Sequence, residues 1–383
     1  MKKIRFGIVG LGSRGRGMYR LAGLFEEVEL TAACDIRPEN WYEKQFGADC
    51  SMAEQFPQTA FYESYDKMLD EAGLDAVMVE TGADIHAEFC AKALAKNIHV
   101  LSDIPVVANL KEADMLWKVA GQSKAFLSTG ANPNEQKFAI MLQDFWKKGL
   151  LGKPYYMEGE YIHPNLPQNA ETDSHLYENG NWRKLLAPIR YCTHSLGPLL
   201  TILEEDLRTV SCFGTGMRAD DYMPGWHKDD MMCAQFQTAS GVVVRLLRNG
   251  RCRAVIGEHN YRVFGTEGYM ERIDWRTESD PPVIRWNSMK ELDVSLKKVD
   301  GEFMPPAYAK NKKAAEGGHG GIDYALLDHF FQAVLKGGPA PIPLKDGLRM
   351  TLPGIYAEES AKRGGQVLRM TYPWDEDWST EII

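Results

Sequence analysis

The chain of 383 residues carries a formal net charge of −9, and 44% of its residues are hydrophobic. This length is sufficient for two domains of ordinary size, each with its own core. The acidic balance argues against a nucleic-acid partner or an anionic membrane surface, because either would need a basic patch. No apolar run approaches membrane-spanning length, so we expect a soluble enzyme that does not bind membranes.

Seven cysteines are spread from Cys34 to Cys252 without a C-x-x-C pair. An odd number in this arrangement matches neither a disulfide framework nor a zinc site, so we expect a reducing, cytoplasmic compartment and no metal. The apolar stretch after Lys3 is short and interrupted by Arg5 and Gly7, which argues against a signal peptide.

Short apolar strands alternate with amphipathic helices over residues 1–130. This alternation predicts a parallel, doubly wound α/β sheet. The predicted strands are Ile4–Val9, Val28–Cys34, Ala76–Val79, His99–Leu101 and Ala125–Ser128.

The first predicted strand leads into glycines with the spacing G-x-G-x-x-G, at Gly10, Gly12 and Gly15. Gly10 permits a tight turn, Gly12 lets a pyrophosphate approach the backbone, and Gly15 lets the next helix pack closely on the strand. The pyrophosphate would cap a helix that starts near Ser13. Asp35, at the end of the second strand, would accept hydrogen bonds from both ribose hydroxyls, which favours NAD over NADP.

Residues 1–130 are therefore predicted to form a dinucleotide-binding domain with NAD as its cofactor. Arg37, two residues after Asp35, weakens the preference for NAD over NADP. The alternative interpretation is a glycine-rich turn in an α/β protein that binds no nucleotide.

After Gly152 the pattern changes to longer alternating strands with few helices between them, which predicts an open, mainly antiparallel sheet in an α+β domain over residues 131–383. The boundary is predicted near Gly130–Asn134. The predicted strands are Tyr155–Tyr161, Thr209–Gly214, Met231–Gln237, Val242–Arg248 and Tyr261–Gly265, and the predicted helices are Tyr191–Leu203, Tyr324–Lys336 and Gly347–Gly364.

Five segments together resemble the Gfo/Idh/MocA superfamily of sugar and cyclitol dehydrogenases over essentially the whole chain. They are the glycine fingerprint, Val77–Thr81 followed by His86, His99–Pro105, Trp182–Arg183 and Gly265–Gly268. Two further segments, Arg190–Pro198 and Gly317–Asp323, are similar to those of the NAD-dependent N-acetylgalactosaminidases of that superfamily.

The resemblance implies a Rossmann domain followed by a substrate-binding domain whose open sheet forms a homo-oligomer. It also implies a carbohydrate substrate and adds Arg14, Thr81, His86, Asp103 and Pro105 to the candidate cofactor-binding residues.

The chain departs from the family at one position. Most members have Glu-Lys-Pro, with a lysine that assists proton transfer beside the nicotinamide, where this chain has Asp103-Ile104-Pro105. Isoleucine neither donates nor accepts a proton. Tyr191 and His194, three residues apart on one face of a predicted helix, are the candidate acid/base pair. The alternative is that both only pack in the core.

The remaining candidates would contact the sugar. His319 lies among four glycines, and Asp323 follows four residues later, where it either serves a ligand or caps a helix. The further candidates are the Trp182–Arg183 pair, as a stacking face and a bidentate donor, and Tyr161 and His163, on one face of a strand.

The resemblance to the N-acetylgalactosaminidases favours a hypothesis of hydride transfer at a sugar ring carbon, with C3 as the expected position. A ketone at C3 acidifies the C2 proton, so that a base can remove it and expel the C1 substituent, after which the hydride returns. Such a redox-neutral glycosidase or lyase needs no paired carboxylates. The alternatives are a net NAD-dependent sugar or cyclitol dehydrogenase and a non-catalytic NAD-binding sensor.

Overall fold

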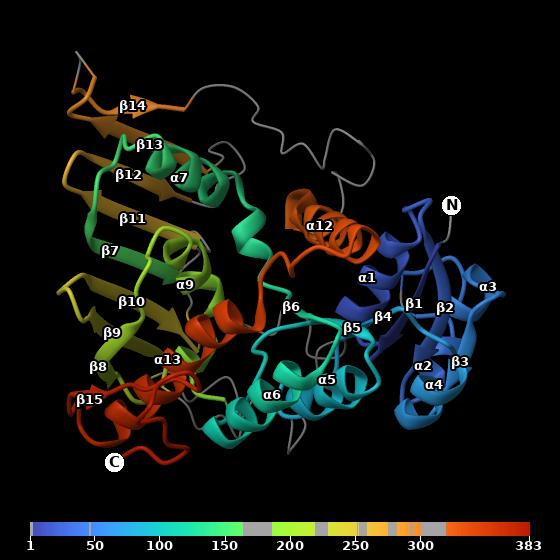
Figure 1. Ribbon diagram of the computed structural model, residues 1–383. Coiled ribbons are helices and arrows are strands. Elements are labelled where there is room, and N and C mark those ends of the chain that lie inside the picture. Colours follow the sequence, from blue (N-terminus) through green and yellow to red (C-terminus); the bar gives the residue numbers. More distant parts are fainter. Residues whose placement is uncertain are drawn as a thin grey trace. The chain divides into compact units, whose positions relative to one another are not determined.

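The computed structural model describes residues 3–45, 47–163, 186–218, 229–250, 252, 259–274, 282–291, 294–299 and 319–383 (Figure 1). The chain divides into two compact units. The first comprises Met1–Glu135 and Met304–Leu348, and the second comprises Gln136–Phe303 and Arg349–Ile383.

The described part of the first unit contains a six-stranded sheet in the order β3-β2-β1-β4-β5-β6, in which every pair of neighbours is parallel. This confirms the predicted doubly wound sheet. The order reverses between β1 and β4, and ligands of such sheets bind at the carboxyl ends of the strands on either side of a reversal. The strands are β1 (Ile4–Val9), β2 (Val28–Cys34), β3 (Ala60–Tyr62), β4 (Ala76–Val79), β5 (His99–Ser102) and β6 (Leu127–Thr129).

The sheet agrees closely with the sequence pattern. β1, β2 and β4 have the predicted bounds, whereas β6 begins two residues later than predicted and β3 was not predicted. β3 is only three residues long and is partly exposed, so its apolar signal is weak.

Helices connect the strands of the first unit. Their ends carry local signals: Ser51 and Glu54 form a capping box at α3, and Asn109 accepts a hydrogen bond from the Glu112 N–H at the start of α6. The helices are α1 (Ser13–Ala22), α2 (Glu39–Tyr42), α3 (Met52–Gln55), α4 (Tyr65–Glu71), α5 (His86–Ala95), α6 (Leu110–Gln122), the 3-10 helices η1 (Asn132–Glu135) and η4 (His319–Gly321), and α12 (Ile322–Lys336).

Helix α12 packs in the first unit although it lies late in the sequence. The ring of Phe331 meets Phe6 of β1 edge-on at 5.1 Å, and Tyr324 stacks on Phe25 at 4.4 Å. The sequence pattern placed all residues after 130 in a second domain, whereas these aromatic contacts bring α12 back to the Rossmann sheet. The returning segment carries His319 and Asp323 into the same unit as the glycine fingerprint.

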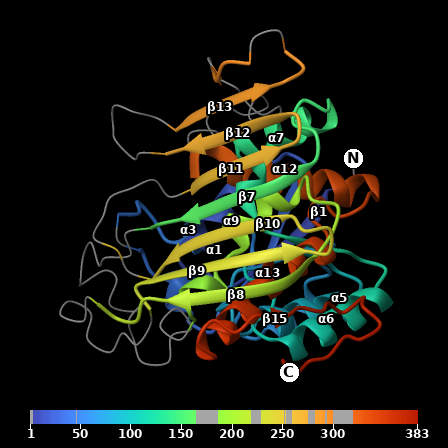
Figure 2. The same ribbon diagram turned by 90° about the vertical axis from the view of Figure 1, so that its left-hand side faces the viewer.

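The second unit contains, within its described residues, a nine-stranded sheet in the order β14-β13-β12-β11-β7-β10-β9-β8-β15 (Figure 2). Neighbours are antiparallel except β7 and β10, which confirms the predicted mainly antiparallel sheet. The strands are β7 (Pro154–Tyr161), β8 (Leu207–Gly214), β9 (Met231–Thr238), β10 (Val243–Asn249), β11 (His259–Gly265), β12 (Gly268–Ile273), β13 (Val283–Ser288), β14 (Lys297–Lys298) and β15 (Leu368–Arg369).

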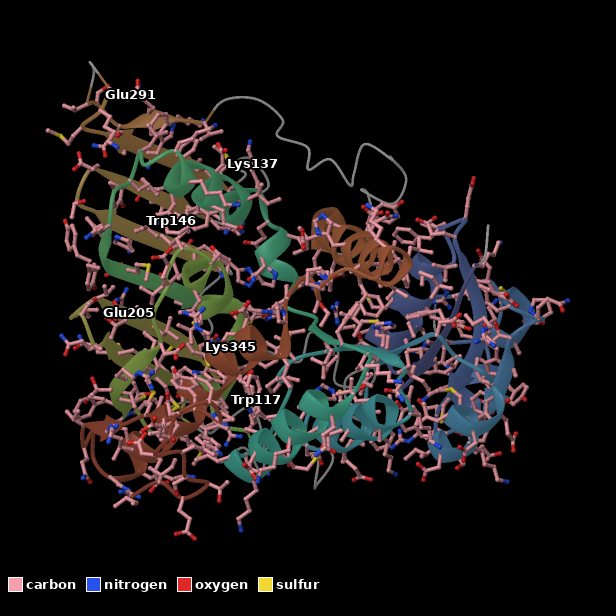
Figure 3. The ribbon with its side chains drawn as sticks, in the orientation of Figure 1. Trp117, Lys137, Trp146, Glu205, Glu291 and Lys345 are labelled. Atoms are coloured by element: carbon pink, nitrogen blue, oxygen red, sulfur yellow. The ribbon has the colours of Figure 1, made fainter. Side chains whose placement is uncertain are left out.

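One face of this sheet is covered by helices, whose bounds are α7 (Lys137–Lys147), the 3-10 helix η3 (Pro188–Arg190), α9 (Thr193–Leu200) and α13 (Leu344–Lys362). Phe138 of α7 stacks on Tyr261 of β11 at 5.1 Å, and both side chains are fully buried. Figure 3 labels Lys137 and Trp146 on α7. Among the described residues of the second unit, no helix lies over the face that Figure 2 turns to the viewer.

Opposite charges alternate across this uncovered face. Arg245 of β10 pairs with Glu158 and Glu160 of β7, at 3.2 and 2.7 Å. Arg262 of β11 pairs with Glu158 at 2.7 Å, and Glu271 of β12 pairs with Arg285 of β13 at 3.2 Å. The face therefore carries ion pairs, and the rings of Tyr156, Phe264 and Tyr269 lie beside them.

The contact of α12 with the first sheet gives a stability prediction. Phe331→Ala removes a fully buried ring, so we expect the unfolding free energy of the first unit to fall by about 3–5 kcal/mol. Leu335→Ala on the same helix is the control, because Leu335 is 43% exposed and its loss should cost less than about 1 kcal/mol. Urea unfolding measures both variants, and equal losses would contradict this packing.

Candidate functional site

The three fingerprint glycines have different surroundings. Gly10 has a φ of +94°, and a Cβ there would lie 2.5 Å from the carbonyl oxygen of Glu80. A Cβ at Gly15 would lie 2.0 Å from the carbonyl oxygen of Gly10, whereas one at Gly12 would have no described heavy atom within 4 Å. Gly10 and Gly15 are therefore required by packing, and Gly12 leaves the backbone open to a ligand.

The first turn of α1 suits an anion. Its N-cap is Gly12, no side chain caps it, and the turn contains no acidic residue. The N–H groups at the start of a helix have no partners within the helix and carry the positive end of its dipole. Together with the open backbone at Gly12, this turn fits the pyrophosphate of a dinucleotide.

Asp35 holds the fingerprint loop in place. Its Oδ2 accepts a hydrogen bond from the Leu11 N–H at 2.6 Å, and its Oδ1 accepts one from the Arg37 N–H at 2.8 Å. A carboxylate has about four acceptor positions, so two remain for hydroxyls. The contact with the adenosine ribose stays a prediction, and the carboxylate is fixed in a position that suits it.

His86 ties together the turns that follow β4 and β5. It is buried, and its ring nitrogens lie 2.9 Å from the carbonyl oxygens of Thr81 and Pro105. The peptide bond between Ile104 and Pro105 is cis. The resemblance makes His86 a candidate cofactor-binding residue, and in the structure both of its ring nitrogens face backbone carbonyl oxygens. The ring therefore joins the turn after β4 to the segment after β5, which contains Asp103.

Arg14, the second residue of α1, lies among three carboxylates. Its Nε is 3.3 Å from Asp103 Oδ1 and 3.6 Å from Glu80 Oε2, and its Nη1 is 3.3 Å from Asp323 Oδ2. Burial by itself would lower the pKa of Arg14, but Asp103, Glu80 and Asp323 outweigh burial and hold the pKa well above its usual value. We predicted contact between Arg14 and the cofactor, whereas its guanidinium is engaged with these acids.

Glu80 differs from the other two acids of this cluster. Its side chain is 2% exposed, and its Oε1 has no hydrogen-bond partner among the described residues. Burial, followed by the negative charge of Asp103, raises the pKa of Glu80 well above its usual value. Glu80 is therefore the acid of this cluster whose charged form burial disfavours most clearly.

Asp323 joins Arg14 to His319. Its buried carboxylate accepts hydrogen bonds from Asn132 Nδ2 at 2.8 Å and from His319 Nδ1 at 2.8 Å, in addition to those from Arg14. Burial alone would raise the pKa of Asp323, but the bond from His319 and the charge of Arg14 lower it below its usual value. Asp323 stays ionised and does not cap α12, whose N-cap is Gly321.

The Asp323–His319 pair is arranged for proton transfer. Because the Asp323 carboxylate accepts a hydrogen bond from His319 Nδ1, that nitrogen carries a proton. The other nitrogen, Nε2 of the half-exposed ring, is left to take or give a proton. His319 has a φ of +50°, which is costly for a residue with a side chain. Such strain recurs at functional sites.

In the second unit, Tyr161 at the end of β7 is the centre of an aromatic cluster. Its ring stacks on His259 of β11 at 4.5 Å and lies 5.3 Å from His194 and 6.2 Å from Tyr191. The guanidinium of Arg248, at the end of β10, lies 4.1 Å from the centre of the Tyr161 ring. The predicted acid/base pair thus lies against a tyrosine, a histidine and a cation.

The cluster confirms that Tyr191 and His194 are neighbours, but the predicted helical spacing is wrong. Their rings are 5.1 Å apart. The helix begins at Thr193, with Cys192 as its N-cap, and Tyr191 lies in the turn that ends η3. The Tyr191 N–H bonds to the carbonyl of Pro188, which closes a tight turn before the helix starts.

The other predicted sugar contacts have mixed outcomes. β7 ends at Tyr161, so His163 lies beyond the strand, where its N–H bonds to Asn249 Oδ1 at 2.8 Å. The rings of Tyr161 and His163 still meet edge-on, with their centres 6.0 Å apart. Trp182 and Arg183 lie outside the described residues.

Four residues of these clusters were missed from the sequence. Glu80 directly follows β4, the strand that pairs with β1, and an acid at that carboxyl end was a usable signal. Asn132 and His259 lie where the sequence predicted no helix or strand. Arg248 ends a predicted strand, and the apolar pattern of that strand did not mark it as a site residue. Their side chains come together only through tertiary contacts.

The parallel sheet, the fingerprint and the open helix end define an NAD-binding protein of the Rossmann class. Comparison with family models agrees with this class. Residues 4–131 match the oxidoreductase family with an NAD-binding Rossmann fold, and residues 147–368 match its C-terminal alpha/beta domain. The chain belongs to the Gfo/Idh/MocA oxidoreductase family and is an enzyme with NAD as its cofactor.

Relatives over nearly the whole chain carry glycosidase names. A glycosyl hydrolase family 109 protein of Shewanella pealeana is 23% identical, with 94% of this chain and 83% of the relative covered. The alpha-N-acetylgalactosaminidase of Shewanella oneidensis is 22% identical over the same shares of the two chains.

Solved structures share the fold at low identity. The scyllo-inositol dehydrogenase of Lactobacillus casei, with NAD(H) and scyllo-inositol bound, has a TM-score of 0.73 at 16% identity and covers 96% of this chain and 99% of its own. The aldose-aldose oxidoreductase of Caulobacter crescentus, complexed with glycerol, has a TM-score of 0.72 at 18% identity and covers 96% and 100%. No helix in the described part of the chain is long and apolar enough to cross a membrane.

The different surroundings of the glycines give a paired prediction. Gly12→Ala should leave the thermal midpoint within a few degrees but weaken NAD by about tenfold or more, because its Cβ enters open space that the pyrophosphate needs. Gly15→Ala should lower the thermal midpoint as well, because its Cβ meets the Gly10 carbonyl at 2.0 Å. Thermal scans and NAD titration test both variants, and unchanged NAD affinity in Gly12→Ala would contradict the site.

Proposed function

We propose that this enzyme moves a hydride at a ring carbon of a sugar, at C3, and completes a redox-neutral glycosidase or lyase reaction. The observation that carries this proposal is the number of proton-transfer groups. His319 is oriented by Asp323, Tyr191 and His194 are neighbours, and the lysine of the family is replaced by the buried Ile104.

The number of groups matters because the two reactions make different demands. Oxidation of an alcohol alone releases one hydroxyl proton, for which a single base is enough. The redox-neutral reaction must also remove the C2 proton, protonate the group that leaves from C1 and deprotonate the incoming water. Two separate acid/base pairs suit these several transfers better than one lysine.

NAD, when bound, accepts the hydride and later returns it. The protein's own residues do the rest. Asp35 and the open backbone at Gly12 hold the two ends of the adenosine diphosphate portion. The ionised Asp323 keeps the Nδ1–H of His319 directed inward, so that Nε2 takes or gives a proton and the charged imidazole is stabilised.

In the second unit we assign Tyr191 and His194 to removal and return of protons on the sugar. These two rings pack beside the side chains of Tyr161, Arg248 and His259, which hold them in place. Tyr161 and His163, with Trp182 and Arg183, are the proposed sugar contacts. The glycosidase names of the relatives support a substituent that leaves from C1.

A panel of nitrophenyl glycosides, assayed with NAD, tests the proposed reaction. We expect nitrophenol release that depends on NAD, without accumulation of NADH. One NADH for each turnover would show the net sugar or cyclitol dehydrogenase instead. NAD binding with neither product, across aryl glycosides, free sugars and cyclitols, would support the non-catalytic sensor.

The predicted acid/base pair can be tested directly. Tyr191→Phe and His194→Ala should each lower turnover by about 10²- to 10⁴-fold, because each removes a proton-transfer group. NAD affinity and the thermal midpoint should stay close to those of the wild type. A turnover loss below about tenfold in both variants would contradict the assignment.

Ile104 gives a prediction about restoring the lysine of the family. If the proton route differs from that of most family members, Ile104→Lys should not raise turnover, and it should lower stability because the side chain at 104 is 2% exposed. Ile104→Met, which keeps the site apolar, is the control. A large gain in oxidation of free sugars by Ile104→Lys would identify a dehydrogenase that had lost its lysine.

We also propose a homo-oligomer formed through the uncovered face of the nine-stranded sheet. The alternating charges of Arg245, Glu158, Arg262 and Glu271 can pair with a second copy of the same face. Light scattering of the purified protein should give a molar mass of more than one chain, and Arg245→Glu should lower that mass toward the mass of the monomer. A monomeric wild type would contradict the proposal, and Lys118→Glu on α6 controls for the change in charge.

A further inference from the structure

We propose that Arg14 is a positioning residue that links the NAD-binding fingerprint to the Asp323–His319 pair. It acts on His319 through Asp323 and is not a ligand of the pyrophosphate. This inference rests on the proposed function only where it assigns proton transfer to His319.

The direction of the Arg14 side chain is the first support. Arg14 belongs to the helix turn that would face the pyrophosphate, yet its guanidinium makes three contacts with Asp323, at 3.3 to 3.4 Å, and one with Asp103 at 3.3 Å. Both acids lie in the same unit as the fingerprint. The planar fork of arginine can serve two carboxylates at once, which the single ammonium of lysine does less well.

The second support is the electrostatic balance. Burial and the charge of Asp103 raise the pKa of Glu80, which lies 3.6 Å from Arg14 Nε, so Glu80 is the weakest partner for the cation. The guanidinium of Arg14 lies between the side chains of Asp103 and Asp323, 3.3 Å from an oxygen of each. The Asp323 side chain is 4% exposed, so an ionised carboxylate there needs the charge of Arg14 and the bond from Asn132.

The third support is the strain at His319. A non-glycine residue at a φ of +50° persists only where surrounding contacts favour it. The bond from His319 Nδ1 to Asp323 is such a contact, and Asp323 is itself fixed by Arg14 and Asn132. Loss of Arg14 should therefore release the histidine ring even though the two residues do not touch in the described contacts.

The alternative is that Arg14 binds the pyrophosphate, and the two roles differ in what they change. A phosphate ligand would lower NAD affinity and leave the His319 ring in place. A positioning residue would change the His319 ring and lower turnover, with NAD affinity nearly constant. Arg20 is a matched control, because it is a cation on the same helix whose Nε bonds to Gln55 at 2.8 Å, away from the cluster.

The test compares Arg14→Gln, Arg14→Lys and Arg20→Gln in the full chain. NAD affinity is measured by titration, and the ring of His319 is followed by NMR of histidine-labelled protein, with His319→Gln to assign its signal. We expect Arg14→Gln to move or broaden the His319 signal and to change NAD affinity by less than about threefold. Arg20→Gln should change neither, and Arg14→Lys should restore part of the His319 signal.

Turnover is a third measurement that tests the proposal. Arg14→Gln should lower kcat by about 10²-fold, the usual effect of a displaced catalytic group, and Asp323→Asn should lower it similarly. Because both act through one histidine, the double variant should be no more than about twofold worse than the poorer single variant. Losses that multiply in the double variant would overturn the proposal.

An Arg14→Gln variant that binds NAD tenfold more weakly while the His319 signal is unchanged would also overturn it. The titration and the NMR measurement need no sugar. If no glycoside is turned over, the function proposed above fails, and the link between Arg14 and His319 is still decided by these two readouts. If Arg14→Gln does not fold, Arg14→Lys decides in its place, because it too should alter the His319 signal with NAD affinity retained.

Discussion

The proposed chemistry of the first unit depends on the contacts that keep the buried carboxylate of Asp323 ionised. A buried charge is stable only with partners, and Asp323 has them from three separate segments: Arg14 of α1, Asn132 of η1 and His319 of the loop before α12. These segments meet because α12 packs its phenylalanines against the Rossmann sheet. Packing of the core thus brings an oriented histidine into the unit that binds the nucleotide.

The second unit follows a different principle. Its candidate side chains lie at the ends of three adjacent strands, in the turn before α9 and in the first turn of α9. Tyr161, His194 and Arg248 meet there as two rings and a cation rather than as a network of ion pairs. The Tyr261 hydroxyl bonds to the carbonyl of His194 and fixes the start of α9 to β11. Rigid sheet ends therefore hold the tyrosine and histidine rings whose proton transfers we propose.

The sequence predicted the parts that depend on local pattern. Alternating apolar runs gave β1, β2 and β4 at their observed bounds, and the glycine spacing gave the start of α1 at Ser13. It failed where tertiary contacts decide. The division at residue 130 could not anticipate the return of α12, which rests on rings distant in sequence, and the helix predicted from Tyr191 begins instead at Thr193 because a turn at Pro188 precedes it. Asn132 was missed for the same reason, since neither spacing nor composition marks a residue that is buried beside Asp323 only in the fold.

The central claim is that the ring is oxidised only transiently, so that the C2 proton becomes exchangeable while the sugar is bound. The most direct measurement is turnover of a reactive glycoside in heavy water, followed by mass spectrometry and NMR of the released sugar. The account predicts one deuterium at C2 in the product and no net NADH. Product without deuterium at C2, formed at the same rate without NAD, would contradict it.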